Sequence, residues 1–229
     1  MESSRHLKGR DLARAAALLF DLDGTLVDTV ETRIVAWLRT FDEFQIPANR
    51  AQVARLIGSD GKRVASVVAE TAGEAIDSQR AEEIDKRAGD IYSELNTDPK
   101  ALPGAIQLLH SLDEHGRLWA IATSSRREQV GASIKVLSLS TRPIIIDGSQ
   151  VKRAKPAPDL LLMAARELGV EPSSSWYVGD AIWDMQAANA AGMASIGVTS
   201  GSATAGELLE AGASFTVGDL TELISRAQL

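Results

Sequence analysis

The sequence predicts an α/β protein, a doubly wound parallel sheet with a second, α-helical domain inserted into it. Six short apolar runs that suit buried strands alternate along the chain with patterns typical of amphipathic helices. The alternation is interrupted once, by a long stretch in which helices alone are indicated. Strands that alternate with helices form parallel sheets covered by helices on both faces, so the regular part predicts the sheet and the interruption predicts the insert.

Each element of the expected sheet domain has a signal of its own. The apolar runs place strands at 15–20, 118–122, 143–146, 176–178, 194–198 and 215–217. The helical patterns lie at 105–115, 128–137, 158–168, 181–191, 205–211 and 220–227. Pro103 and Gly104 precede the first of these helices, and Gly169 and Gly192 mark the ends of the third and fourth.

The inserted segment is expected to consist of helices at 28–44, 50–57, 62–71 and 78–96. Asp28, with Glu31 three positions later, has the spacing of a capping box, which predicts that the first of these helices begins there. We therefore expect one domain at 1–26 and 99–229 and the helical domain at 27–98. A chain of 229 residues has room for both.

Composition excludes several classes of protein. The chain has no cysteine, so disulfides, thiolate metal sites and cysteine nucleophiles are ruled out. Its 24 Lys and Arg against 31 Asp and Glu give a net charge of −7, which disfavours binding to nucleic acid. The apolar run at 15–20 is too short to span a membrane and no signal-peptide cleavage pattern follows it. We expect a cytoplasmic protein that binds neither nucleic acid nor membrane.

Four short polar stretches each follow an expected strand, and ligands bind at the carboxyl ends of the strands in open parallel sheets. In the first stretch, Asp21 and Asp23 are followed by Gly24, where the chain must turn. Two carboxylates in this arrangement suit a hard cation such as Mg2+, and an aspartate can also act as a nucleophile or move protons. Taken by itself, the stretch is equally consistent with a turn that uses aspartate and glycine for their backbone preferences.

The second and third stretches offer groups for a phosphate. Thr123, Ser124 and Ser125 follow the strand at 118–122, and hydroxyls and N–H groups at the start of a helix bind phosphate oxygens. Simple helix capping by Ser125 is the alternative. Lys155 lies in a loop stiffened by the prolines that follow it, which could aim its ammonium back over the strand ends, although a solvated lysine is the commoner case.

In the fourth stretch, Asp180 ends a buried strand and Asp184 lies one helical turn later on the same side. The pair could supply one direct metal ligand and one partner that orients it. The alternative is the placement of acidic residues at a helix N-terminus, which the helix dipole favours.

Together the four stretches resemble the motifs of the haloacid dehalogenase superfamily, in its large phosphatase branch. The motifs occur in the family's order: Asp-x-Asp-Gly-Thr-Leu-Val-Asp-Thr at 21–29, a hydroxyl at 123, Lys-Pro-x-Pro-Asp at 155–159 and Gly-Asp-x-x-x-Asp at 179–184. The resemblance covers essentially the whole chain. It implies a Rossmann-like core, with the helical insert as a four-helix cap that closes over the active site.

The resemblance also implies roles for these residues. Asp21 would be the nucleophile that forms an aspartyl phosphate, and Asp23 would protonate the leaving alcohol and then activate water. Mg2+ would be held by Asp21, the main-chain carbonyl of Asp23 and Asp180. Asp184 would orient the site through water or a hydrogen bond to Lys155.

The groups that would bind the phosphoryl oxygens come from the same motifs. Thr123 and Lys155 would neutralise charge on these oxygens, and the N–H groups of Leu22 and Ser124 would add hydrogen bonds. The sequence leaves open whether Thr123 or Ser124 supplies the hydroxyl of the second motif.

The presence of Asp23 favours phosphoryl transfer, because the dehalogenating relatives lack an acid at that position. The prediction is a Mg2+-dependent phosphatase for a small phosphorylated metabolite, such as phosphoglycolate or a sugar phosphate, acting as a monomer or weak homodimer. In the cap, the loop at 58–62 resembles the family's specificity loop. Lys62 and its neighbours Arg55 and Arg63 are candidate substrate contacts, and a helix–helix turn with a solvated lysine is the alternative.

Three other functions stay open. A β-phosphoglucomutase-like isomerase shares the core, although its cap usually shows Gly-x-Ser-Arg, from which Gly-Ser-Asp-Gly-Lys at 58–62 departs. A phosphonate hydrolase would need a cap lysine, here Lys62, with a pKa lowered by burial. A non-catalytic phospho-aspartate switch would use the acidic edge only to hold metal, and such domains lack a helical insert after the first strand.

Overall fold

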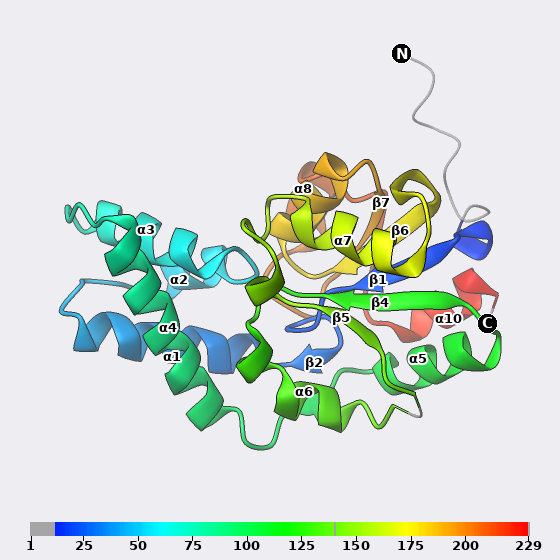
Figure 1. Ribbon diagram of the computed structural model, residues 1–229, viewed down its shortest axis with the longest axis horizontal. Coiled ribbons are helices and arrows are strands. Elements are labelled where there is room, and N and C mark those ends of the chain that lie inside the picture. Colours follow the sequence, from blue (N-terminus) through cyan, green and yellow to red (C-terminus); the bar gives the residue numbers. More distant parts are fainter. Residues whose placement is uncertain (1–11, 140, 229) are drawn as a thin grey trace, which may run out of the picture.

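A parallel sheet forms the centre of the larger part of the molecule in the computed structural model, which describes residues 12–139 and 141–228 (Figure 1). Within those residues the sheet has six strands in the order β5-β4-β1-β6-β7-β8, all parallel. The strands are β1 (Ala17–Phe20), β4 (Leu118–Ala122), β5 (Ile144–Ile146), β6 (Ser175–Gly179), β7 (Ala194–Val198) and β8 (Phe215–Val217). The predicted fold class is confirmed, and every predicted strand is found within two residues of its expected ends.

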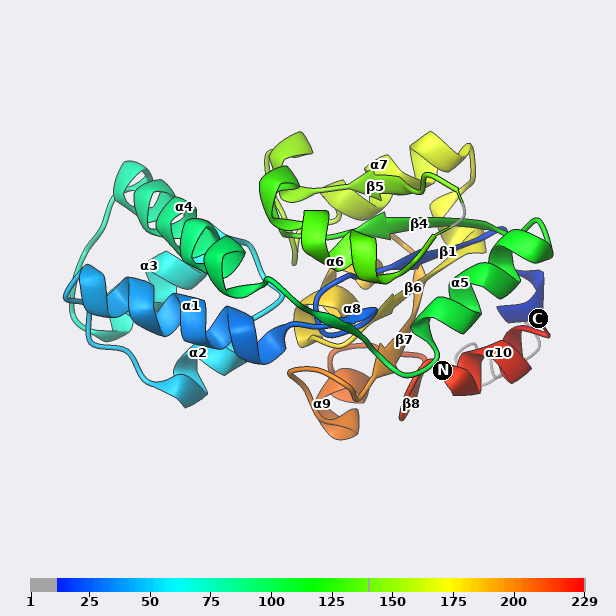
Figure 2. The same ribbon diagram turned by 90° about the horizontal axis from the view of Figure 1, so that it is seen from below.

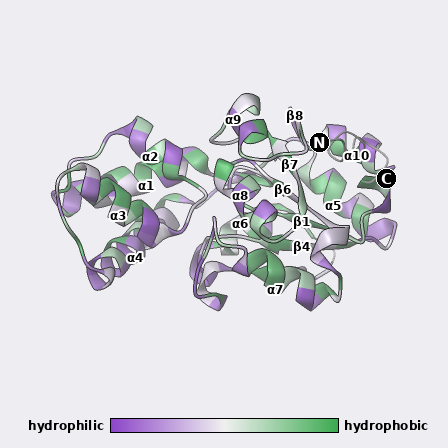
Figure 3. Cartoon of the chain, turned by 90° about the horizontal axis from the view of Figure 1, so that it is seen from above, coloured by the Kyte–Doolittle hydropathy of each residue, from purple (hydrophilic) through white to green (hydrophobic). Residues whose placement is uncertain are grey.

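Alternation of side chains along the central strand explains why both faces of the sheet are covered. Leu18 and Phe20 of β1 enter a cluster with α5 and α10, whereas Ala17 and Leu19 enter one with α7 and α8. In Figure 1, α7 and α8 lie above the sheet and α5 lies below it, and Figure 3 shows hydrophobic residues along the strands and in α7. The helices are α5 (Ala105–Glu114), α6 (Gly131–Val136), α7 (Asp159–Leu168), α8 (Ile182–Ala190), α9 (Ala205–Glu210) and α10 (Thr221–Ala227).

The helical cap lies to one side of the sheet, beyond the carboxyl ends of its strands (Figures 1 and 2). Phe41, Val68 and Ile84 are fully buried in a hydrophobic cluster of the cap's own. That cluster also takes in Trp183, which comes from α8 of the sheet domain, so the two parts share packing. The cap helices are α1 (Val30–Glu43), α2 (Arg50–Leu56), α3 (Gly61–Thr71) and α4 (Ser78–Leu95).

Two features at the cap boundary differ from expectation. A short antiparallel ribbon, β2 (Val27–Asp28) with β3 (Lys100–Ala101), joins the two parts where no strand was predicted. The predicted capping box is also wrong, because Asp28 is in β2 and Thr29 occupies the N-cap without a side-chain capping bond. The carboxylate of Glu31 forms an ion pair with Arg50 instead.

The helix predicted at 128–137 is also divided in two. A 3-10 turn, η2 (Arg127–Gln129), precedes α6, which begins only at Gly131. The division lets the side chain of Gln129 turn back to accept hydrogen bonds from the N–H of Arg126 and from Arg33 of the cap. Across the described part of the chain, no helix combines the length and hydrophobicity needed to cross a bilayer.

The core packing gives a direct prediction for stability. Leu108 of α5 is fully buried in the main cluster, so we expect Leu108→Ala to lower the free energy of unfolding by about 2–5 kcal/mol in urea titrations. Leu209→Ala is the matched control, because this leucine is 49% exposed and should change stability little. An equal loss in both variants would contradict the described packing.

Candidate active site

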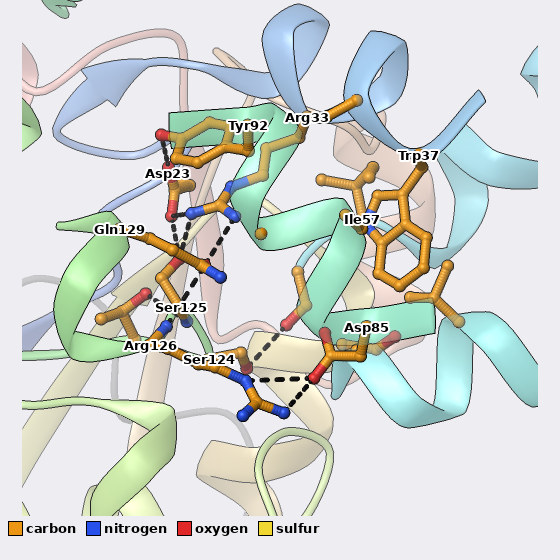
Figure 4. A pocket seen from close by; sticks show the side chains of 18 of the residues that line it. Asp23, Arg33, Trp37, Ile57, Asp85, Tyr92, Ser124, Ser125, Arg126 and Gln129 are labelled. Carbon is orange, nitrogen blue, oxygen red and sulfur yellow. Dashed lines mark hydrogen bonds and ion pairs between the residues drawn. The ribbon is translucent and has the colours of Figure 1, made fainter. Parts of the chain in front are cut away.

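The carboxyl ends of two adjacent strands, β1 and β4, meet the cap at one cavity (Figure 4). Strand β1 lies between β4 and β6, so the residues that follow these strands, Asp21, Thr123 and Asp180, come to the same edge of the sheet. All three are buried. The cavity is lined by the ends of β1 and β4 on one side and by residues of α1, α3 and α4 on the other.

A buried ammonium group lies at the floor of the site. Lys155, which is 0% exposed, donates to Asp21 Oδ1 at 2.6 Å, to Asp184 Oδ1 at 2.7 Å and to the Tyr177 hydroxyl at 3.2 Å. That hydroxyl in turn donates to the carbonyl of Ala122 at 2.8 Å. Burial disfavours the charged ammonium, but the carboxylates of Asp184 and Asp21 outweigh it and raise the pKa of Lys155 well above its ordinary value, so the lysine is a cation.

Asp180 is held from two sides. Its Oδ1 accepts from the Thr25 hydroxyl at 3.0 Å, and its Oδ2 accepts from the N–H of Ser202 at 3.0 Å. Burial, followed by repulsion from the carboxylate of Asp184, raises the pKa of Asp180 to about 7. The same two effects, with burial the larger, raise the pKa of Asp21 despite the attraction of Lys155.

These carboxylates form a site that fits a metal ion. One oxygen from each of Asp21, Asp180 and Asp184 lies within 4.8 Å of the others. Together with Asp23 there are four buried carboxylates against two cations, Lys155 and Arg33, which leaves an excess of negative charge. A divalent cation bound by oxygen ligands would balance that excess.

Asp184 supports the other members of this group. Its Oδ1 accepts from Lys155, and its Oδ2 accepts from the N–H of Ala181 at 2.9 Å. Both oxygens are therefore already engaged. One of these donors is a cation, whereas both donors to Asp180 are neutral, so Asp184 suits the role of orienting the lysine better than that of binding a metal directly.

Asp23 is the most heavily hydrogen-bonded carboxylate of the site. Its Oδ1 accepts from Thr29 at 2.6 Å and from the Tyr92 hydroxyl at 2.9 Å, and its Oδ2 accepts from Arg33 at 3.0 Å and from Ser125. Burial alone would raise the pKa of Asp23, but the charge of Arg33 and these hydrogen bonds outweigh it and lower the pKa. Asp23 is therefore held as an anion in this arrangement.

Arg33 brings the cap into contact with this carboxylate. It comes from α1 and lies over the ring of Tyr92 of α4, with 3.4 Å between the guanidinium carbon and the ring centroid. It also donates to Gln129 Oε1 at 2.9 Å. Figure 4 shows these side chains gathered around Asp23.

The predicted cap loop reaches the cavity. Gly58, Ser59 and Gly61 line it, and the carbonyl of Gly58 accepts from the Ser124 hydroxyl at 3.2 Å. The N–H of Asp60 donates to the carbonyl of Lys155 at 2.8 Å, so the loop that carries the lysine is tied to the cap.

Not every predicted residue is brought to this cavity. Lys62 is half-exposed, with its ammonium 3.6 Å from Glu82, and it is not among the lining residues. The side chain of Arg55 is exposed to solvent. Its main-chain carbonyl accepts a hydrogen bond from Trp183 Nε1 at 3.1 Å. Arg63 lies over the Trp183 ring at 4.9 Å. Thus the loop at 58–62 lies at the cavity as expected, whereas the side chains proposed as substrate contacts do not line it.

The remaining predicted residues are placed as follows. Thr123 and Ser124 both line the cavity, and Thr123 also accepts from the N–H of Ser125. Leu22 lies between the two aspartates of the first motif, with its side chain in the hydrophobic core. Ser125 does not cap η2, because Arg126 occupies the N-cap and the serine hydroxyl donates to Asp23.

Sequence reasoning missed the cap residues around Asp23. Arg33 lies one helical turn after Thr29, the last residue of the first motif, and this spacing was a usable signal. Tyr92 is 69 positions from Asp23 and has no comparable signal, since only the packing of α1 against α4 brings it there.

The chain is similar in sequence to known proteins. A sequence model of the family described as haloacid dehalogenase-like hydrolase matches residues 18–198. Validoxylamine A 7'-phosphate phosphatase of Streptomyces hygroscopicus subsp. limoneus is 32% identical over 79% of this chain and 84% of its own length. Hexitol phosphatase A of Escherichia coli is 33% identical over 73% of this chain and 76% of its own length.

Solved structures agree with these relatives. A hydrolase from Pseudomonas syringae superposes with a TM-score of 0.87 at 34% identity, covering 91% of this chain and 96% of that one. The chain also matches the chloroplastic protein SUPPRESSOR OF QUENCHING 1 of Arabidopsis thaliana at 30% identity, but there it spans only 18% of the relative's length.

Proposed function

Because the chain belongs to the haloacid dehalogenase-like hydrolase family, as a hydrolase of phosphate monoesters, we propose that it releases phosphate from small sugar or polyol phosphates through an aspartyl phosphate on Asp21. The observation that carries this proposal is the meeting of Asp21, Asp23, Thr123 and Lys155 at one cavity under the cap. The substrates named for the relatives support the small, phosphorylated class.

Asp21, the main-chain carbonyl of Asp23 and Asp180 are the groups we assign to Mg2+. Their hard oxygens and the excess of negative charge support that choice. When bound, the ion would act as a Lewis acid that balances charge on the phosphoryl oxygens. Lys155, fixed by Asp184, supplies the protein's own positive charge at the same place.

In the first step, Asp21 attacks phosphorus and the bond from phosphorus to the ester oxygen breaks. Lys155 holds Oδ1 of Asp21, whereas no hydrogen bond from a described residue reaches Oδ2, so we assign the attack to Oδ2. A proton from Asp23 passes to the departing oxygen, and Asp23 must take up that proton before this step, because Arg33 and the hydrogen bonds described above favour its carboxylate form. Thr123, Lys155 and the N–H groups of Leu22 and Ser124 are the assigned partners of the phosphoryl oxygens.

In the second step, Asp23 takes a proton from the water that attacks the aspartyl phosphate, and Asp21 is restored. This step needs the carboxylate form of Asp23. Arg33, Ser125 and Tyr92 hold that form in the arrangement described here.

Trapping labelled phosphate on the protein tests the proposal as a whole. Acid quenching during turnover of a labelled sugar phosphate should leave label on Asp21, and Asp21→Asn should carry none. Absence of label from the wild-type protein during turnover would exclude the aspartyl phosphate. A persistent label with no release of inorganic phosphate would instead favour the isomerase or the phospho-aspartate switch.

Asp23→Asn should lower kcat for alkyl phosphates by about a hundredfold to ten-thousandfold, because the leaving alkoxide loses its acid. The loss should be smaller for p-nitrophenyl phosphate, whose leaving group needs little protonation. Asp28→Asn makes the same chemical change at an exposed carboxylate of β2 and is the control. Equal losses for both kinds of ester would show that Asp23 is not the acid.

A backbone position beside Asp180 allows a test of the metal assignment. A Cβ at Gly201 would lie 1.8 Å from Asp180 Oδ2, so Gly201→Ala should displace the carboxylate and weaken Mg2+ binding about tenfold or more in calorimetric titrations. Gly206→Ala adds the same methyl group where nothing lies within 4 Å and should bind Mg2+ as the wild type does. Equal affinity of the two variants would argue against Asp180 as a ligand.

A further inference from the structure

An ion pair between the two parts of the chain borders the cavity at some distance from the aspartates. Arg126 follows β4 in the sheet domain, and Asp85 belongs to α4 of the cap. Arg126 Nε donates to Asp85 Oδ2 at 3.2 Å, and the nearer Nη2 donates to both Asp85 Oδ2 and Glu82 Oε1. Asp85 and Arg126 line the cavity (Figure 4), whereas Glu82 is 45% exposed and does not.

No uncompensated cation faces the cavity from the described residues. Its cationic lining residues are Lys155, Arg33 and Arg126, and each already contacts a carboxylate. Lys155 is committed to the phosphoryl group in the proposed reaction, and Arg33 is committed to Asp23. Arg126 is therefore the cation left for a second anionic group on a substrate. The carboxylate of Asp85, which contacts Arg126, would repel that group.

Asp85 also has an oxygen available for a neutral partner. Arg126 contacts Oδ2, and no described residue donates a hydrogen bond to Oδ1. That oxygen lies against Gly61, where a Cβ would come within 1.8 Å of it, so the close approach depends on glycine. A carboxylate oxygen of this kind accepts a hydrogen bond from a hydroxyl group.

The neighbouring wall suits the rest of such a molecule. Trp37, Ile57 and Val64 line the cavity from the cap and present apolar surface. A polyol has C–H groups that can pack against this surface and hydroxyls that can reach the Asp85–Arg126 pair.

We propose that Asp85, paired with Arg126, determines substrate specificity by selecting phosphate esters whose leaving group is neutral and hydroxylated and rejecting those with a second anionic group. The inference rests on the proposed phosphatase function and deepens it. Of the two candidates expected from the sequence, it favours a sugar phosphate over phosphoglycolate.

The test compares kcat/KM for a hexitol 6-phosphate with kcat/KM for phosphoglycolate. The wild type should prefer the hexitol phosphate. Asp85→Asn removes the repelling charge from the cavity and leaves Arg126 paired only with Glu82, which does not line the cavity. Arg126 can then attract the carboxylate of phosphoglycolate, so the ratio should fall at least about tenfold, with an absolute gain on phosphoglycolate.

Two further variants separate specificity from general damage. Glu82→Gln removes the other carboxylate that contacts Arg126, but outside the cavity, and should leave the ratio unchanged. Gly61→Ala pushes Asp85 away without changing any charge and should lower kcat/KM for the hexitol phosphate, which keeps the proposal testable if Asp85→Asn does not fold.

The outcomes are distinguishable from failure of the proposed function. A wild type that hydrolyses no phosphate ester would overturn both proposals. An active wild type with an unchanged ratio in Asp85→Asn, or with an equal shift in Glu82→Gln, would overturn the role of Asp85 alone.

Discussion

The buried contact of Lys155 with Asp21 and Asp184 is the interaction on which the rest of the site depends. An ammonium group without solvent contact is costly unless carboxylates compensate it, and here two do so at 2.6 and 2.7 Å. Those carboxylates come from the end of β1 and from α8, the helix that follows β6. The triad of Lys155, Asp21 and Asp184 therefore requires β1 and β6 to be neighbours in the sheet. The order of the strands and the compensation of the buried ammonium charge thus depend on each other.

The triad also links the cap to the sheet domain. The loop that carries Lys155 accepts a hydrogen bond from the N–H of Asp60 in the cap, and Ala154 in that loop donates back to the Asp60 carboxylate. At the opposite side of the cavity, Arg33 of the cap neutralises Asp23. Each catalytic aspartate is therefore in contact with a cation that has a link to the cap, directly for Arg33 and through its loop for Lys155.

Sequence patterns predicted the parts of the structure that depend on local physics. Buried strands such as β4 have continuous apolar runs, and Asp21 and Asp180 could be located because each directly follows a strand at the ligand-binding edge of the sheet. Lys155 lies further along the chain after β5 and was located from the prolines that follow it. The capping box failed because spacing cannot show that Asp28 is needed in the β2–β3 ribbon.

The cap side of the site was less predictable for a related reason. The loop at 58–62 could be placed from its glycines, but the direction of Lys62 depends on Glu82, a partner on another helix. Arg126 and Asp85 are 41 positions apart and pair only through the packing of α4 against η2. Pairings of this kind are set by tertiary structure, and a single sequence gives them no periodic signal.

The location of the Asp85–Arg126 pair at the interface has a consequence for the way selection would operate. In the arrangement described here, Asp85 offsets the attraction of Arg126 for an anion, so the phosphoryl group is the anion left to Lys155 in the proposed reaction. Separation of the cap from the sheet domain would remove Asp85 and Glu82 from Arg126 together, because both belong to α4. Arg126 would then attract anions from solvent, which would be useful for an acidic chain with a net charge of −7. The same arginine would thus serve attraction in one state and discrimination in the other, because its carboxylate partners belong to the other part of the chain.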